Sequence, residues 1–371
     1  MARWLGLAVD PTVGGTTYDD IDGGGITVPD PDLWVPATTG TMTAGSNNLD
    51  RNNEVRGRRG NTAPIVFNSD PRGSFEVRAY PRIVQAIVAT ALGKVGTPTG
   101  TSPAAVTTPV TPVESNPLPT LVMHMLREEQ YEVITGMAVS SFELNLAADA
   151  EGTINLSDGR GLYHDVPQTL PSPLPTPSYR GLNDTFLLRD AVAYIGGDDR
   201  TQGVRIPCLS GFTLTYDNNL IDDFQSRFCA GENVRTYSLN GKTYRVWNPG
   251  RHKVGPQSVT GTLQFADVRP DLELRRILAD AERFEIHCTA GPIAGASPAA
   301  DETMVITLHQ QVLTGGGADP LVKEGDIRAS YEFGGFLDPE TNDDITIEFV
   351  SARPVVVGPI AAGGSGSGSG G

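Results

Sequence analysis

Apolar and polar residues alternate over short stretches of this chain, which predicts strands rather than long helices. Residues 75–80 alternate in this way, as expected for a half-buried strand. The period then changes: residues 83–92 place apolar side chains three and four apart behind Pro81, and Gly93 is a typical helix end. Residues 263–278 repeat the same order of strand, proline and apolar helical face. The pattern therefore predicts sheets that each carry one packed helix.

Two stretches of the chain match each other without a gap, which indicates an internal repeat. The matched residues are Val35, Pro36, Thr39, Gly40, Asn47, Asn48 and Leu49 in the first stretch and Ile206, Pro207, Ser210, Gly211, Asn218, Asn219 and Leu220 in the second. Further on, residues 73–81 match 261–270 with one extra residue, and a pair of strand-like runs in 136–156 matches 325–350. The sequence therefore predicts one module present twice.

The predicted fold class is mainly β, with two tandem β-sandwich modules, each flanked by one α-helix. Glycine (43 residues) and proline (28) are abundant in the 371-residue chain, which favours short strands separated by turns. The predicted organisation is an N-terminal extended arm (1–33), a first module (34–203) with a Pro/Thr-rich loop (97–119), a second module (204–355) with a long hairpin insertion (221–249), and a C-terminal arm and Gly/Ser linker (356–371). A loop comparable to 97–119 is expected at 290–300.

The chain is acidic, with 28 basic and 44 acidic residues and a formal net charge of −16. This balance argues against nucleic-acid binding by phosphate neutralisation. An acidic surface is what a protein that DNA slides past would have; the alternative interpretation is that the charge only keeps the protein soluble. Cys208, Cys229 and Cys288 lack the spacing of a zinc site or a disulfide framework. No apolar run is long enough for a signal peptide or a membrane span, so we expect neither export nor a membrane partner.

No catalytic or cofactor-binding motif occurs in the sequence, so we expect no enzyme activity, no metal and no cofactor. His164-Asp165 lacks a nucleophile nearby, and Glu128-Glu129 is interpreted as a solvated pair because adjacent strand residues point apart. The short stretch Asp20-Ile21-Asp22-Gly23 lacks the bidentate glutamate that closes a calcium loop.

Two regions are candidates for binding a partner. The first is a basic cluster expected to pair with acidic residues of another subunit, the alternative being a solvated loop; the cluster is Arg51, Arg56, Arg58 and Arg59, and the acidic residues are Asp19, Asp20 and Asp22. The second is a hairpin predicted by an Asn-Gly pair between alternating residues. Its candidate contact residues are Arg235, Tyr237, Leu239, Asn240, Gly241, Tyr244 and Trp247.

The chain resembles the major tail tube proteins of long, non-contractile-tailed bacteriophages (siphophages). The resemblance is carried by the N-terminal Trp4-Leu5-Gly6-Leu7-Ala8, the strand from Gly73-Ser74 through Tyr80-Pro81 into residues 83–93, and the strands at 136–144 and 258–265. These segments span most of residues 4–350.

This resemblance implies a sandwich whose inner strands join those of other copies in a multi-chain β-barrel ring around a channel. A chain with two modules would complete the six-membered ring of the family with three copies. The implied protein is a structural part of the virion tail, assembled in the host cytoplasm. Its rings stack into a tube through which DNA passes without specific binding. The implied partners are other copies of the chain, a tape-measure protein, a tail terminator and tail-tip proteins.

Acidic residues on or beside the paired strands are the candidates for lining the channel: Glu143, Asp149, Glu151, Glu332 and Asp338. Two alternative functions stay open. One is a tail terminator or tail-tip hub, which would share the module, and the other is a virion-surface tandem β-sandwich that binds carbohydrate or a receptor.

Overall fold

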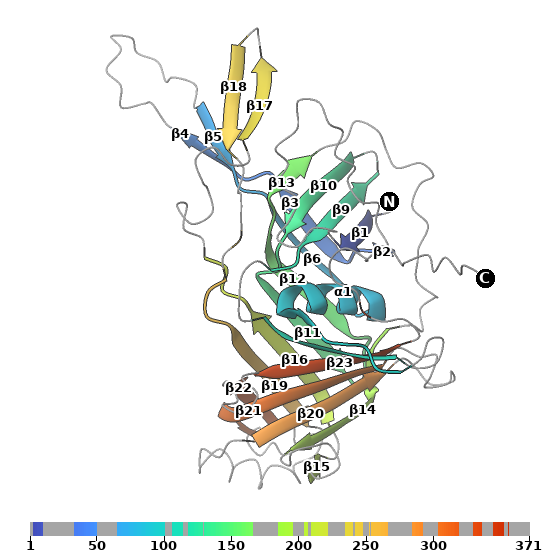
Figure 1. Cartoon of the computed structure of the whole chain (residues 1–371). Helices are drawn as coiled ribbons and strands as arrows, with labels where there is room; N and C mark the ends of the chain where they lie inside the picture. The colour runs from blue at the N-terminus through green and yellow to red at the C-terminus, as the bar shows by residue number, and fades with distance from the viewer. Residues whose placement is uncertain are drawn as a thin grey trace, which may run out of the picture.

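The computed structural model shows a mainly β protein in which one helix lies among three sheets (Figure 1). The structure describes residues 3–9, 33–49, 65–100, 106–113, 118–128, 130–165, 185–195, 204–206, 209–221, 234–239, 242–247, 252, 254–265, 284–291, 303–318, 329–335, 344–351 and 355.

The smaller sandwich layer is a five-stranded antiparallel sheet with the order β13-β10-β9-β1-β2. Its strands are β1 (Arg3–Val9), β2 (Leu33–Pro36), β9 (Leu121–Arg127), β10 (Gln130–Met137) and β13 (Tyr163–Asp165). β9 is buried along almost its whole length. It therefore has a continuous apolar sequence and not an alternating one.

A fourteen-stranded sheet runs through both halves of the chain, with the main order β15-β14-β20-β21-β22-β19-β16-β11-β12-β6-β3. Its first-half strands are β3 (Thr39–Thr43), β6 (Arg72–Arg78), β7 (Gly93–Val95), β8 (Val106–Pro112), β11 (Ser141–Ala147) and β12 (Thr153–Arg160). Its other strands are β14 (Leu187–Ile195), β15 (Val204–Ile206), β16 (Leu209–Asp217), β19 (Ser258–Phe265), β20 (Phe284–Gly291), β21 (Thr303–Ala318), β22 (Ala329–Gly335) and β23 (Ile345–Ser351). We call the part formed by β3, β6, β12, β11, β16, β19, β22 and residues 311–318 of β21 the central sheet.

Helix α1 (Pro81–Leu92) begins and ends where the sequence predicts. Pro81 starts the helix without losing a hydrogen bond, and Gly93 ends it with a left-handed φ of 88° while its N–H donates to the Ala89 carbonyl oxygen. Ile83, Val84, Ile87 and Val88 are fully buried in the common core, which stabilises the helix by apolar burial.

The core lies between the five-stranded sheet and the central sheet. Phe75, Phe142 and Leu144 on the central sheet and Leu5 and Met123 on the opposite layer belong to one continuous buried cluster. The layers approach closely, because a Cβ added at Gly73 would lie 2.8 Å from the Met123 Sδ. This is the β-sandwich expected from the alternating strands.

The order of strand pairing is the same in the two halves of the chain. The first half has β13-β10-β9-β1-β2 in one layer and β11-β12-β6-β3 in the central sheet, and the second has β23-β21-β20-β14-β15 and β21-β22-β19-β16. β21 serves in both layers: residues 303–308 pair with β23 and residues 311–318 with β22. The change of layer coincides with a positive φ of 49° at Gln310. In the first half the same role is divided between β10 and β11.

This pairing shifts one of the expected correspondences by a strand. Residues 136–156 were matched to 325–350, but β22 and β23 do not pair with each other as β11 and β12 do; β21 lies between them. By pairing order, β12 corresponds to β22, and β11 to the second half of β21. The strands of the two matched segments are therefore not all equivalent in the fold.

Two segments pair elsewhere than their expected division of the chain implies. Arg3–Val9, expected in the N-terminal arm, forms the strand between β2 and β9. β14, upstream of the expected boundary between residues 203 and 204, pairs with β20 of the second half. By pairing, the strands of the second half therefore begin with β14.

The expected loop at 97–119 contains a strand. Val106, Thr108 and Val110 are buried in β8, which pairs with β23 of the second half and with β7. The valines and threonines of β8 favour a strand between two neighbours, and the strand forms although it contains Pro109 and Pro112. The expected second helix lies outside the described residues, as does most of 290–300.

Candidate functional site

One face of the central sheet is apolar and buried, and the other carries small polar and acidic side chains. A row of residues that are direct neighbours in register crosses the polar face: Thr39, Glu76, Asn155, Glu143, Thr215 and Thr260. The next row consists of Arg78, Thr153, Asn145, Thr213, Thr262 and Glu332. Hydroxyl and amide groups keep such a face hydrated without offering an apolar platform to a ligand.

The charged groups of this face are mainly acidic. Glu143 and Glu332 are exposed and Glu76 is half-buried. Arg78, the basic member of the two rows, is neutralised by Glu151, whose Oε2 lies 2.7 Å from the Arg78 Nη1. A polyanion facing this surface would meet unpaired carboxylates and little free positive charge.

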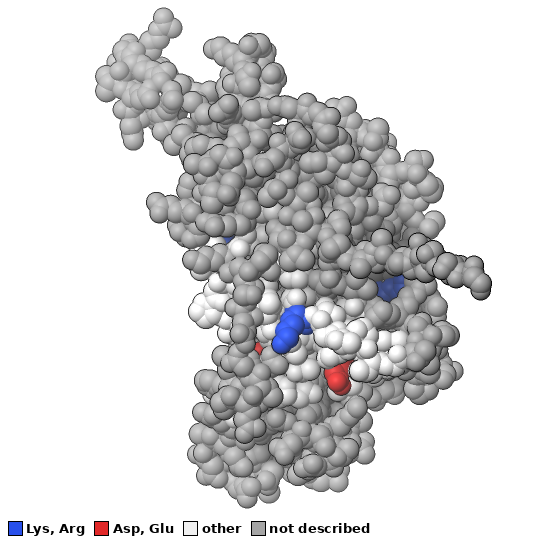
Figure 2. Space-filling model, in the orientation of Figure 1, with Lys and Arg blue, Asp and Glu red and all other residues white. Residues whose placement is uncertain are grey.

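The structure thus brings together some of the candidate channel residues. Glu143 and Glu332 share the polar face, Asp149 is exposed in the turn between β11 and β12, and Glu151 follows that turn. Asp338 lies outside the described residues. Figure 2 shows the side of the molecule around α1, where the described surface is mostly uncharged and has no extended basic patch.

Two hairpins lie together at one end of the described part of the molecule. β4 (Ser46–Leu49) and β5 (Ile65–Ser69) form one hairpin, β17 (Val234–Leu239) and β18 (Lys242–Trp247) form another, and both share a four-stranded sheet in the order β17-β18-β5-β4 (Figure 1). The hairpins are joined through Trp247 opposite Asn68. In the sequence, the β4–β5 hairpin lies between β3 and β6, and the β17–β18 hairpin lies between β16 and β19.

Most of the residues predicted for the two candidate partner-binding regions fall on the hairpins or between their strands. Arg235, Tyr237 and Leu239 are on β17, and Tyr244 and Trp247 are on β18. Leu239 pairs with Lys242, so the predicted two-residue connection is Asn240-Gly241, which itself lies outside the described residues. The arginine cluster Arg51, Arg56, Arg58 and Arg59, between β4 and β5 in sequence, is also outside them, as are Asp19, Asp20 and Asp22.

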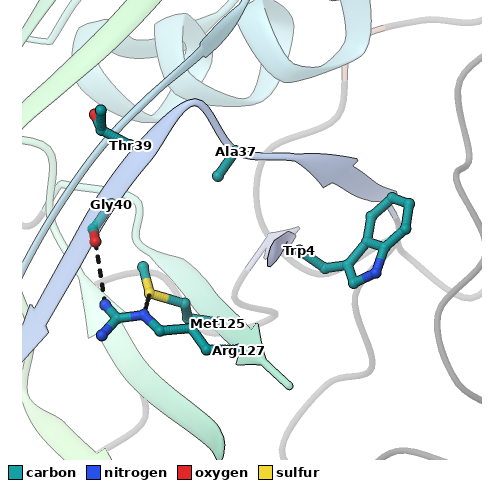
Figure 3. Close-up of a pocket in the computed structure, with 6 residues that line it drawn as sticks. All are labelled: Trp4, Ala37, Thr39, Gly40, Met125 and Arg127. Atoms are coloured by element: carbon teal, nitrogen blue, oxygen red, sulfur yellow. Dashed lines mark hydrogen bonds between the residues drawn. The ribbon is translucent and has the colours of Figure 1, made fainter. Parts of the chain in front are cut away.

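A pocket of about 150 Å³ lies beside β3, at the end of the central sheet (Figure 3). It is lined by Trp4, Ala37, Thr39, Gly40, Met125 and Arg127. The Arg127 Nη2 donates to the Gly40 carbonyl oxygen at 3.1 Å, and its Nε lies 3.0 Å from the Met125 Sδ. The pocket has no carboxylate, thiol or imidazole in its lining, so it carries no candidate catalytic group. Sequence patterns gave no signal for it, because its walls come from three distant strands.

Tyr216 is a buried polar group in the middle of the central sheet. Its ring stacks on Phe142 with centroids 5.8 Å apart, and its hydroxyl makes no hydrogen bond to the described residues. Burial raises the pKa of Tyr216 well above its usual value of 10.0, and the nearby carboxylates of Asp344 and Asp217 raise it further.

We expect Tyr216→Phe to remove part of the alkaline instability of the protein. The raised folded-state pKa means that only the unfolded chain readily loses this proton; the stabilisation is therefore complete below the usual pKa and is lost as the pH rises above it. Denaturant unfolding at pH 8 and pH 11 measures the effect. The loss of stability between these pH values should be smaller in Tyr216→Phe than in the unchanged chain, and an identical loss would contradict the prediction.

The described residues include no group of three or more potential metal ligands and no helix long and apolar enough to cross a membrane. His164, considered above as a catalytic base, lies with its Nε2 3.2 Å from the Glu132 Oε2. This is a contact across the β10–β13 pair, away from any nucleophile among those residues.

Paired sandwich layers, a polar sheet face and projecting hairpins define a structural β-sandwich protein. The family model for phage tail tube proteins matches residues 11–335, and the chain belongs to this family. It is thus a structural component of a phage tail that assembles with itself into a tube. A comparison with curated proteins gave no match.

Proposed function

We propose that this chain is the major tail tube protein of a siphophage, in which three copies close into a ring and rings stack into a hollow tube that conducts genomic DNA. The family membership supports the tube. The repeated pairing order supports a duplicated module, because each half supplies the same succession of strands to the central sheet. Three such chains would give a ring with sixfold pseudo-symmetry.

The polar face of the central sheet would line the channel of this ring. Glu76, Glu143 and Glu332 are the acidic members of its two rows, and Asp149, Glu151 and Asp338 would add charge at or near its edges. Like charge disfavours adhesion of the DNA backbone, so DNA would pass without specific binding.

The paired hairpins would stack one ring on the next. The two hairpins project together from one end of the molecule. In the sequence, the arginine cluster lies between β4 and β5, the two strands of the first hairpin. We propose that Arg51, Arg56, Arg58 and Arg59 pair there with carboxylates of a neighbouring copy, with Asp19, Asp20 and Asp22 as the candidates. In the assembled tail the partners would be the tape-measure, terminator and tail-tip proteins, and assembly would take place in the host cytoplasm.

The experiment that tests this function is negative-stain microscopy of the purified protein together with native mass measurement of single rings. We expect open-ended tubes and a ring mass of three chains. A ring of six chains would contradict the trimer while retaining the tube. Isolated rings that never elongate would favour a terminator or hub, and stable monomers would overturn the tube function.

A further inference from the structure

The two halves of the central sheet are joined by a strand pair within the chain. β11 and β16 are antiparallel in a continuous register from Ser141 opposite Asp217 to Ala147 opposite Gly211. Two further backbone bonds extend this seam, from the Ala148 N–H to the Ser210 carbonyl oxygen (2.9 Å) and from the Asn218 N–H to the Ser140 carbonyl oxygen (2.7 Å). The seam shows how the edge strand of the first half, β11, pairs with the edge strand of the second half, β16.

The central sheet ends in two edges that have no partner strand among the described residues. At one end, β3 pairs only with β6, and at the other, residues 312–318 of β21 pair only with β22. By pairing order, β3 corresponds to β16, and residues 311–318 correspond to β11. The two open edges are therefore the counterparts of the two strands that form the internal seam.

Along β3 and the following Ala44, every second residue directs its backbone N–H and C=O groups toward the open edge. The Asp70 N–H donates to the Gly45 carbonyl oxygen at 2.6 Å, which places Gly45 on the β6 side. Because antiparallel residues alternate between the two sides, Gly40, Met42 and Ala44 direct their N–H and C=O groups away from β6. The bond from Arg127 to the Gly40 carbonyl oxygen agrees with this assignment.

The register of the internal seam can be transferred to the open edges. Met42 lies opposite Gly73 as Leu214 lies opposite Gly261, and these two glycines are the matched positions of the repeat. At the other edge, Ala318 lies opposite Ala329 as Leu144 lies opposite Ile154. Leu144 and Leu214 are partners in the internal seam, so Ala318 and Met42 are equivalent partners across two copies.

We propose that the surface formed by β3 and the Arg127 pocket binds the β21 edge of a second copy, with Gly316, Gly317 and Ala318 opposite Ala44, Thr43 and Met42. This inference rests on the proposed ring and names the strands and the register that close it. The pairing is head-to-tail and continues the sheet from chain to chain, which removes both open edges.

The pocket marks a place where this seam differs from the internal one. By register, Gly40 takes the position of Phe212, one residue beyond Gly211, its match in sequence; the β16–β19 pairing has a register shift between Leu209 and Gly211. The Phe212 ring stacks on Phe333 at 6.2 Å, and Phe212 pairs with Leu146. A Cβ at Gly40 would lie 2.8 Å from the Met125 Cε, so the glycine lets Met125 approach β3 beside the space that Arg127 and Trp4 line. The pocket lies just beyond the proposed pair of Met42 and Ala318, the last residue of β21.

Site-specific photocrosslinking tests the register. In Thr43→p-benzoylphenylalanine the probe replaces an exposed side chain, while the edge groups of its neighbours stay intact. Illumination of assembled protein should give a two-chain product on a denaturing gel, and mass spectrometry should place the crosslink in residues 312–318 of the second copy. The matched control is Thr215→p-benzoylphenylalanine in the internal seam, which should crosslink to residues 141–147 without doubling the mass.

A second pair of variants tests the edge itself. Ala44 is exposed, and Ala44→Pro removes an edge amide that β6 does not use. The chain should therefore fold, while the yield of rings falls about tenfold relative to Ala44→Ser, which keeps the amide. Equal ring yields in the two variants, or rings whose Thr43 crosslinks fall outside β21, would overturn the proposed seam while leaving the tube function standing. Absence of rings from the unchanged chain would instead overturn the proposed function.

Discussion

Asn218→Ala should destabilise the chain by about 2–4 kcal/mol, because it leaves two buried carbonyl groups without their donor. The Asn218 side chain is fully buried, and its Nδ2 donates to the carbonyl oxygens of Ala91 and Val139, each at 2.9 Å. Ala91 is in the last turn of α1, and Val139 lies between β10 and β11, whereas Asn218 directly follows β16. The Asn218 side-chain amide therefore links the second half of the chain to the helix and core of the first by hydrogen bonds.

Denaturant unfolding of purified protein under non-assembling conditions would measure this loss. Asn219→Gly is the matched control: Asn219 is exposed and has a positive φ of 45°, which glycine accepts without strain. We expect the control to change stability by less than about 1 kcal/mol. If Asn218→Ala were no more destabilising than Asn219→Gly, the amide would not hold the two halves together.

Deletion of residues 238–243 should abolish tube elongation while leaving a folded chain that still forms single rings. The deletion removes the tip of the β17–β18 hairpin, from the Ser238–Thr243 pair outward. Among the described residues, the hairpin pairs with the rest of its sheet at Trp247 opposite Asn68, away from the tip, so we expect the sandwich core not to depend on the tip. Electron microscopy would count tubes and rings.

The control for this deletion is the double variant Ser238→Ala with Thr243→Ala. These residues face each other across the hairpin, and alanine keeps the backbone ladder. The double variant should form tubes of normal length. Normal tubes from the deletion itself would show that ring stacking does not use the hairpin.

Local signals in the sequence were sufficient for the elements whose determinants are local. Pro81 and Gly93 delimit α1 because each residue suits only one end of a helix. Asn240-Gly241 predicts the β17–β18 hairpin because it suits the tight turn between twisted strands. The sequence also named Glu143 and Glu332 as channel candidates but did not assign them to a face, because their common face depends on the pairing of β11, β16, β19 and β22.

Elements that depend on distant partners could not be read in this way. β1 is stabilised by β9, more than a hundred residues away in sequence, and β8 by β23 of the other half. Residues 315–317 are three consecutive glycines, which are typical of a turn, yet they lie within β21 because β22 supplies the ladder. The open edges and the Arg127 pocket depend on this pairing, so no sequence motif marks them.

The strand β8 has a mechanical consequence. Within one chain, two strand pairs join the halves: β11 with β16 in the central sheet and β8 with β23 in the outer layer. β13, the first-half counterpart of β23, pairs only with β10 among the described residues. β8 thus ties the outer layer of the first half to that of the second within one chain. In the proposed ring each chain would then enter as one stiff double segment, so that the relative position of its two halves is set before the ring closes.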